Sequence, residues 1–221
     1  MLQNGYKASR GNRLRYEFGR PNLMTTDSPS RRSPRDRIVD AARGLFRKHG
    51  VRGVGVDAIV DAADSNKMTL YRHFSSKDDL IVECLRRAGM EMDAYWRELE
   101  EAHPGDGLAQ LRDWVRRIAD HLGANDCNCE LISAAVQLTD EDHPARSVIK
   151  KFKDAQRDHV LELCRKARVA NAELLCDTLL LLIEGARLHQ QSSGHEGPSA
   201  RFAEIADAAI LSFAESSAVA E

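Results

Sequence analysis

Eight residues in the first half of the chain combine a polar side with an apolar one. The run Lys-Met-Thr-Leu-Tyr-Arg-His-Phe over residues 67–74 sets Leu70 and Phe74 four positions apart, on one face of a helix. Its other side chains are left to point away from that face. Arg72 carries a planar fork of donors that matches the O6 and N7 acceptors of guanine in the major groove. The run therefore predicts a helix that packs through its apolar face and offers its polar face to DNA.

Two further helices are predicted to hold this segment. Ser33 is a candidate N-cap with Pro34 at the first helical position, and a helically spaced apolar stripe runs from there to a stop at Gly50. A second short helix is predicted over residues 56–63, and Asn66 caps the third. Two short helices separated by a three-residue turn form a helix-turn-helix.

Longer helices are predicted beyond residue 76. Ser76 and Asp79 form a capping box for a helix that begins at Lys77. Polar breaks rich in Pro, Gly and Asp separate the later helices, and strand-type alternation is hard to find. The expected helices cover residues 77–102, 107–123, 127–138, 143–168, 171–191 and 198–216. The sequence thus indicates an all-α protein.

The stretch from about Arg35 to Arg87 resembles the N-terminal domain of the TetR/AcrR family of bacterial regulators. The features that carry the resemblance are Thr69-Leu70-Tyr71-Arg72-His73-Phe74, then Ser76-Lys77-Asp78-Asp79-Leu80, and upstream Ala41-Ala42-x-x-Leu45-Phe46 and Gly50. The resemblance implies an N-terminal three-helix helix-turn-helix DNA-binding domain over residues 34–80 and a C-terminal helical ligand-binding and dimerisation domain over 81–221. It implies base-edge or nearby backbone contacts for Lys67, Met68, Thr69 and Arg72, and phosphate contacts for Tyr71, His73 and Lys77.

The phosphate contacts have plainer interpretations. Lys77 stands in the first turn of its helix, where a docked phosphate would use its charge and the free backbone N–H groups, but it could equally be a solvated surface lysine. Tyr71 and His73 could be half-buried scaffold residues. Whether each of these side chains contacts DNA depends on which of its two interpretations is correct.

Three positions depart from the family pattern. Asp64 stands at the turn position that usually holds glycine, and it must adopt a left-handed conformation. Gly55 replaces the usual Ser or Thr cap of the second helix, which costs only a few tenths of a kcal/mol. Met68 replaces a small residue and could alter base preference. None of these changes removes a required DNA contact.

Charge is distributed unevenly along the chain. Residues 1–80 hold 16 Lys and Arg against 9 Asp and Glu, whereas residues 81–221 hold 16 against 25, so the two parts carry +7 and −9. A basic N-terminal part favours a polyanionic partner. Part of the excess comes from residues 1–33, which are predicted to form a disordered basic tail. Translation could start at Met24 within it.

The acidic C-terminal part is expected to supply the dimer interface and the ligand pocket. Apolar residues wrap almost fully around the helix near residues 174–183, and the last helix has a broad stripe with small residues. A four-helix dimer interface is also what the resemblance implies, although these residues could merely complete the monomer core. The dimer candidates are Leu179, Leu182, Ile183, Phe202, Ile205, Ala209 and Phe213.

Pocket candidates are the aromatic, His and Cys side chains of this part, each of which could instead be an ordinary core or surface residue. They are Trp96, Trp114, His121, Phe152, His159 and Cys176. Cys127 and Cys129, with His121 nearby, do not match the ligand spacing of a closed zinc site. Two small residues at the start of a helix are the better interpretation, so no metal or cofactor is expected.

Several classes of protein are disfavoured. The chain has no Gly-rich phosphate loop, no His-Glu-x-x-His helix and no Gly-x-Ser-x-Gly elbow, so an enzyme is not expected. It also lacks an apolar stretch of about 20 residues and a signal core, which predicts a cytoplasmic protein with reduced thiols.

The resemblance implies a ligand-responsive repressor that binds a pseudo-palindromic operator as a homodimer and is released by a small molecule. The alternative is a helical protein-interaction module with a vestigial DNA motif. Affinity for DNA that falls steeply with salt would separate the two.

Overall fold

Helices make up the regular structure of the part of the chain that the computed structural model describes, residues 33–123, 130–194 and 196–218, and these residues contain no strand. The helices are α1 Pro34–Gly53, α2 Val56–Ala62, α3 Lys67–His73, α4 Lys77–Ala102, α5 Gly107–Gly123, α6 Glu130–Gln137, α7 Ala145–Lys166, α8 Ala172–Ser193, a 3-10 turn η2 Pro198–Arg201 and α9 Phe202–Ala218. The all-α prediction is confirmed. The predicted tail, Ser33 apart, and Met24 lie outside the described residues.

The predicted N-caps are present where the sequence indicated them. The hydroxyl of Ser33 accepts a hydrogen bond from the backbone N–H of Asp36 at 3.1 Å, and the side chain of Asn66 accepts one from Thr69 at 2.8 Å. The Ser76 hydroxyl accepts from the N–H of Asp79 at 3.0 Å. These bonds satisfy N–H groups that have no partner within the helix.

Helix ends differ from the predictions where the backbone turns sharply. Gly50 has φ +74°, and a further helical turn continues past it to Gly53. The amide of Gln137 lies where a Cβ of residue 50 would be, and its Oε1 accepts from the N–H of Arg52 at 3.3 Å. Glycine is needed here for both conformation and space. Near the C-terminus, the predicted single helix over 198–216 begins as the tighter turn η2.

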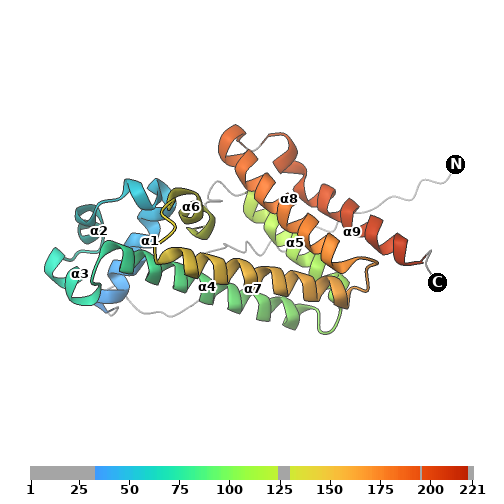
Figure 1. Cartoon of the computed structure of the whole chain (residues 1–221), viewed down its shortest axis with the longest axis horizontal. Helices are drawn as coiled ribbons and strands as arrows, with labels where there is room; N and C mark the ends of the chain where they lie inside the picture. Colours follow the sequence, from blue (N-terminus) through green and yellow to red (C-terminus); the bar gives the residue numbers. More distant parts are fainter. Residues whose placement is uncertain (1–32, 124–129, 195, 219–221) are drawn as a thin grey trace, which may run out of the picture.

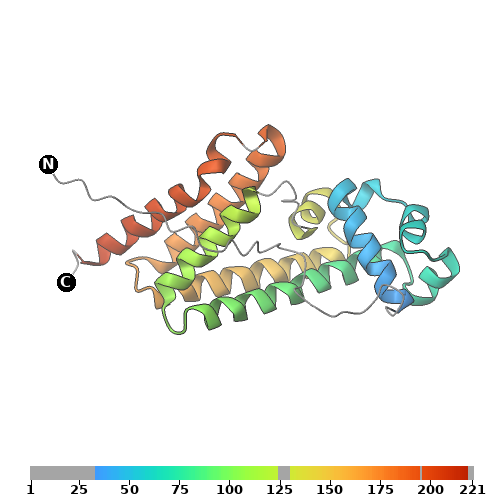
Figure 2. The same ribbon diagram turned by 180° about the vertical axis from the view of Figure 1, so that it is seen from behind.

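Two apolar cores lie along the molecule, and α4 contributes to both. The first core joins the head, defined here as α1–α3, to Leu80 and Leu85 of α4, and the second joins Trp96 and Leu99 of α4 to the body, defined as α5–α9. The head lies at one end, α5, α8 and α9 lie at the other, and α4 and α7 run side by side between them (Figures 1 and 2). Residues of α6 and α7, including Ile149, also enter the first core, so packing does not change abruptly at residue 80.

Among the residues that the structure describes, no helix is long and apolar enough to cross a membrane.

Candidate nucleic-acid interface

The turn between α2 and α3 is held by a side chain from α1. Asp64 adopts φ +46°, as the sequence predicted for this non-glycine turn. Arg37 donates from Nε to the carbonyl of Ala63 at 3.3 Å and from Nη2 to that of Asp64 at 3.2 Å. This role of Arg37 could not be predicted from the sequence, because its partners lie 26 and 27 residues away and no local pattern marks them.

The helix α3 has the two faces that its sequence predicted. Leu70 and Phe74 are 0% and 2% exposed and belong to the first core. Met68 is 83% exposed and Tyr71 52%, and the Arg72 side chain is exposed without an ionic or hydrogen-bonding partner among the described residues. The helix lies at the end of the molecule far from α9 (Figure 1). A polar, accessible helix face is what insertion into a DNA groove requires.

Lys67, the first residue of α3, forms an ion pair with Asp57 of α2 at 2.7 Å. The lysine side chain remains 56% exposed and that of Asp57 75% exposed. The hydrogen bond to Asp57, with the attraction between the two charges, raises the pKa of Lys67. The amine is therefore charged and accessible, but a carboxylate lies directly beside it.

His73 and Thr69 are less accessible than their neighbours. Both side chains are half-buried, and Nε2 of His73 is enclosed without a hydrogen-bond partner among the described residues. A phosphate could reach this nitrogen only if the ring turned. The predicted phosphate contact through His73 therefore lacks the orientation that it needs here.

The N-terminus of α4 combines Lys77 with acidic neighbours. Lys77 is half-buried, and burial lowers its pKa, partly offset by Asp78. The carboxylate of Asp79 accepts from the backbone N–H of Ser75 at 3.2 Å, and Asp78 lies 3.3 Å from Nε2 of His143. A phosphate at this terminus would meet two carboxylates as well as the lysine.

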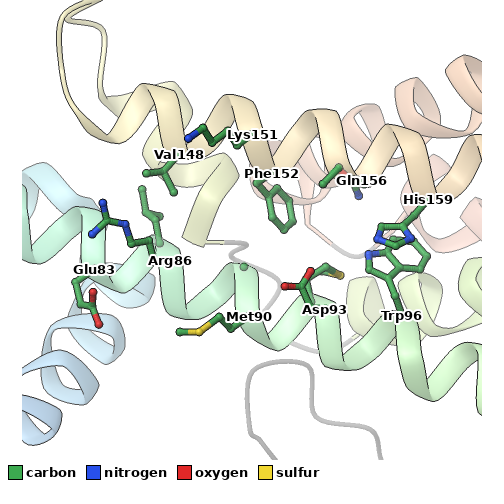
Figure 3. Close-up of a pocket in the computed structure, with 14 residues that line it drawn as sticks. Glu83, Arg86, Met90, Asp93, Trp96, Val148, Lys151, Phe152, Gln156 and His159 are labelled. Atoms are coloured by element: carbon green, nitrogen blue, oxygen red, sulfur yellow. The ribbon is translucent and has the colours of Figure 1, made fainter.

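Three of the six pocket candidates lie together. Trp96, Phe152 and His159 line a cavity of about 430 Å³ between α4 and α7 (Figure 3). Trp114 and Cys176 are 1% and 0% exposed within the second core and do not line it. His121 is half-buried on α5, also away from this cavity. The spacing of residues along one helix could not show which candidates line the cavity, because the cavity depends on how α4 and α7 pack.

The dimer candidates divide between the core and the surface. Leu179, Ile183 and Phe202 are at most 2% exposed inside a single chain, so another subunit could not contact them without rearrangement. Leu182, Ala209 and Phe213 are half-buried, and Ile205 is 37% exposed. The apolar side chains that α8 and α9 expose most are not among these candidates. They are Leu174, Leu181, Leu188 and Leu211.

The described cysteines form no disulfide and no metal site. Cys84, Cys164 and Cys176 are buried thiols, and burial raises the pKa of Cys176 to about 11. No group of three His, Cys, Asp or Glu side chains within the described residues could hold a metal ion. Cys127 and Cys129 lie outside those residues.

Sequence comparison places the helix-turn-helix among known regulators. The family model described as bacterial regulatory proteins, tetR family, matches residues 38–84. Over 67 residues the chain is 40% identical to the HTH-type transcriptional repressor KstR of Mycobacterium tuberculosis, and this match covers 30% of this chain and 30% of that one. Over 79 residues it is 32% identical to the HTH-type transcriptional regulator AcrR of Shigella flexneri, covering 36% of this chain and 37% of that one. These matches span about a third of the length of the relatives.

Comparison of structures extends the likeness into the body. A TetR-family transcriptional regulator from Streptomyces coelicolor, SCO4454, superposes with a TM-score of 0.74 at 25% identity, covering 82% of this chain and 96% of that one. The arrangement of head and body is therefore shared over most of the chain, although the sequence match is concentrated in the head.

Proposed function

The chain belongs to the TetR family of bacterial regulatory proteins, and we propose its function on that basis. Proteins of this family are DNA-binding transcription regulators and not enzymes. The finer proposal is that this protein is a repressor that binds a pseudo-palindromic operator as a homodimer in the cytoplasm and leaves it when a small molecule binds. The domain assignment of 34–80 for DNA and 81–221 for ligand and dimer is part of this proposal.

The accessible face of α3 is the single observation that carries DNA binding. Arg72 lies exposed on it, where it can pair with guanine, and the exposed thioether of Met68 suits the methyl group of thymine. Lys67 and Thr69 complete the base-facing set. Tyr71 is the exposed phosphate contact, whereas Lys77 is half-buried beside two carboxylates. His73 joins them only after its ring turns.

The exposed apolar faces of α8 and α9 support a dimer. Leu181 and Leu188 are 73% and 66% exposed, seven positions apart and so on one side of α8, and Ile205 and Leu211 are exposed on α9. Pairing these faces with a second copy would remove them from water. It would also bring two α3 helices to one duplex, where successive major grooves lie about 34–36 Å apart.

The cavity between α4 and α7 supports effector control. Part of its wall belongs to α4, which follows α3 in the chain and enters the first core, so a ligand there contacts a helix that packs with the head. A ligand that favours one arrangement of α4 and α7 would shift the population of DNA-competent dimers.

Selection of operators from random DNA, followed by gel shifts of the best site over a range of salt concentrations, tests the proposal. We expect sequence-selective binding that weakens steeply as salt rises, because phosphate contacts release counterions. Arg72→Ala should relax the selected sequence, whereas Arg112→Ala, at an exposed position of α5, should not. Absence of DNA affinity at every salt concentration would favour the protein-interaction alternative.

A further inference from the structure

The cavity between α4 and α7 is walled by apolar and aromatic side chains. Met92 and Trp96 of α4 and Val148 and Phe152 of α7 line it. Met90, which also lines it, is 60% exposed (Figure 3). Its volume of about 430 Å³ is within the range of about 300–1,000 Å³ that is typical of small-molecule sites. A ligand of drug-like size with a largely apolar body fits these walls.

Two buried polar groups in the same walls have no hydrogen-bond partner. Gln156 is 4% exposed and Trp96 8%, and no hydrogen bond joins the amide or the indole N–H to another described residue. Both lie at the end of the cavity nearest His159 (Figure 3). Neither group is among the fully enclosed polar atoms that lack a partner, so both reach the open space of the cavity, where water or a ligand oxygen can bond to them.

The charged side chains of the cavity lie at its rim. Arg86, Asp93 and Lys151 are exposed to solvent, where an ion pair with a ligand would contribute little to its affinity. Glu83 is less exposed, and it pairs with Arg35 at 3.1 Å and with Arg87 at 3.5 Å. A charged ligand group beside Gln156 would have only the exposed Asp93 and His159 near it, so it would lose hydration in exchange for a weak pairing.

The imidazole of His159 closes the polar end of the cavity. It stacks on the indole of Trp96 with ring centroids 4.8 Å apart and an interplanar angle of 17°, and Trp96 stacks in turn on Trp114 at 6.1 Å. These contacts hold the indole in one orientation. The donor at this end is therefore fixed before a ligand arrives, which favours a ligand acceptor at a defined position.

We propose that this cavity takes an uncharged, largely apolar ligand whose carbonyl-type oxygen accepts hydrogen bonds from the Trp96 indole N–H and the Gln156 amide. The inference rests on the proposed function only in identifying this ligand with the effector. Binding itself depends on the cavity alone.

Four probes with the same body and different head groups test the proposal by calorimetric titration of the full-length protein. They are 4-phenylcyclohexanone, phenylcyclohexane, 4-phenylcyclohexanecarboxylate and 4-phenylcyclohexylamine, which offer a neutral acceptor, no acceptor, an anion and a cation. We expect the ketone to bind most tightly, by about tenfold over the hydrocarbon, because two otherwise unpaired groups gain a partner. Tighter binding of the carboxylate or the amine would overturn the assignment.

Two variants assign the contacts. Gln156→Leu and Trp96→Phe each remove one polar group, so each should weaken the ketone about threefold relative to the hydrocarbon, as expected for one of two bonds that together give about tenfold. Lys150→Ala, on the same helix but 76% exposed in its side chain, is the matched control and should bind both probes as the wild type does. Unchanged ketone affinity in both variants would contradict the proposal. Melting curves without probe establish that each variant is folded, and if one is not, the other carries the test.

Gel shifts with the selected operator separate this inference from the proposed function. DNA binding without ketone binding would overturn only the ligand assignment. Ketone binding without any DNA binding would overturn only the regulator.

Discussion

The head and the body use their cations differently. On α3, Arg72 has no partner among the described residues, and Lys67 forms an ion pair with Asp57, whose side chain is 75% exposed. On α7, Arg157 and Arg165 pair with acids of α8 at 2.9 and 2.8 Å, and Lys153 pairs with Glu184. These three cations of α7 therefore connect helices of one chain, whereas those on α3 are available to an anion from outside. The same residue types thus indicate binding in one region and packing in the other.

The largest expected effect compares two neighbouring leucines of α8. Leu179 is fully buried, so Leu179→Ala should lower the free energy of unfolding by about 2–5 kcal/mol. Leu181 is 73% exposed, so Leu181→Ala should leave the monomer stable and weaken association. Chemical denaturation and sedimentation at several protein concentrations measure the two quantities. A Leu181 variant with unchanged association would remove this face from the proposed dimer.

Arg187 is a cation of the body that does not follow the pattern of ion pairs between helices. Its side chain lies on the buried face of α8 at 5% exposure, and its Nε has no partner among the described residues. Replacing a buried charge by an apolar side chain of similar length is often neutral or stabilising by about 1–4 kcal/mol. Arg187→Met should therefore raise the melting temperature, while Arg157→Met, at an exposed ion pair, changes stability by at most about 1 kcal/mol. A lower melting temperature for Arg187→Met would mean that the charge is paired in solution.

Within the head, Arg72 and Lys77 should affect DNA binding in different ways. Arg72→Ala should reduce discrimination at one base position by about 1–3 kcal/mol. Lys77→Ala should weaken all sequences alike and reduce the slope of affinity against salt by about 1. Binding curves for the operator and its single-base variants at several salt concentrations distinguish the two patterns. Equal effects on every sequence from both variants would contradict a base contact by Arg72.

The smallest expected effect concerns Asp36, which links α1 to α4. Hydrogen bonds from Ser33 and then from Arg87 lower the pKa of this carboxyl below its ordinary value of 3.8. Its stabilising contribution is therefore present above that value and is lost as the pH falls through the lower folded pKa. Because the side chain is 43% exposed, Asp36→Asn should cost less than about 1 kcal/mol at neutral pH. Denaturation of both proteins at neutral and acidic pH should show the difference vanish in acid, and a difference that grew there would contradict this assignment.

Local signals made the head predictable from the sequence. Ser33, Asn66 and Ser76 bond to N–H groups three residues away, and Leu70 and Phe74 lie one turn apart, so the pattern that predicts each feature lies within the element itself. Even there, Arg37 and the enclosed nitrogen of His73 depend on contacts between helices, and the sequence did not reveal them.

In the body, helix positions were predictable and the roles of side chains were not. Leu179 and Leu181 are two positions apart in a helix that is apolar almost all round, yet one is buried and the other is the most exposed leucine of α8. Only the packing of α8 against α7 and α9 decides which face is covered. Gln156 escaped notice for the same reason, since its environment comes from α4 and not from its own helix.

The length of α4 gives small movements in the body a large effect at the DNA. Its 26 residues span about 39 Å, from the base of the head, along the wall of the cavity, to the second core. A tilt of about 5° over that length displaces the far end by about 3 Å, close to the rise of about 3.4 Å between adjacent base pairs. In the proposed dimer, such a tilt would move one α3 by about one base pair relative to the half of the operator that it contacts.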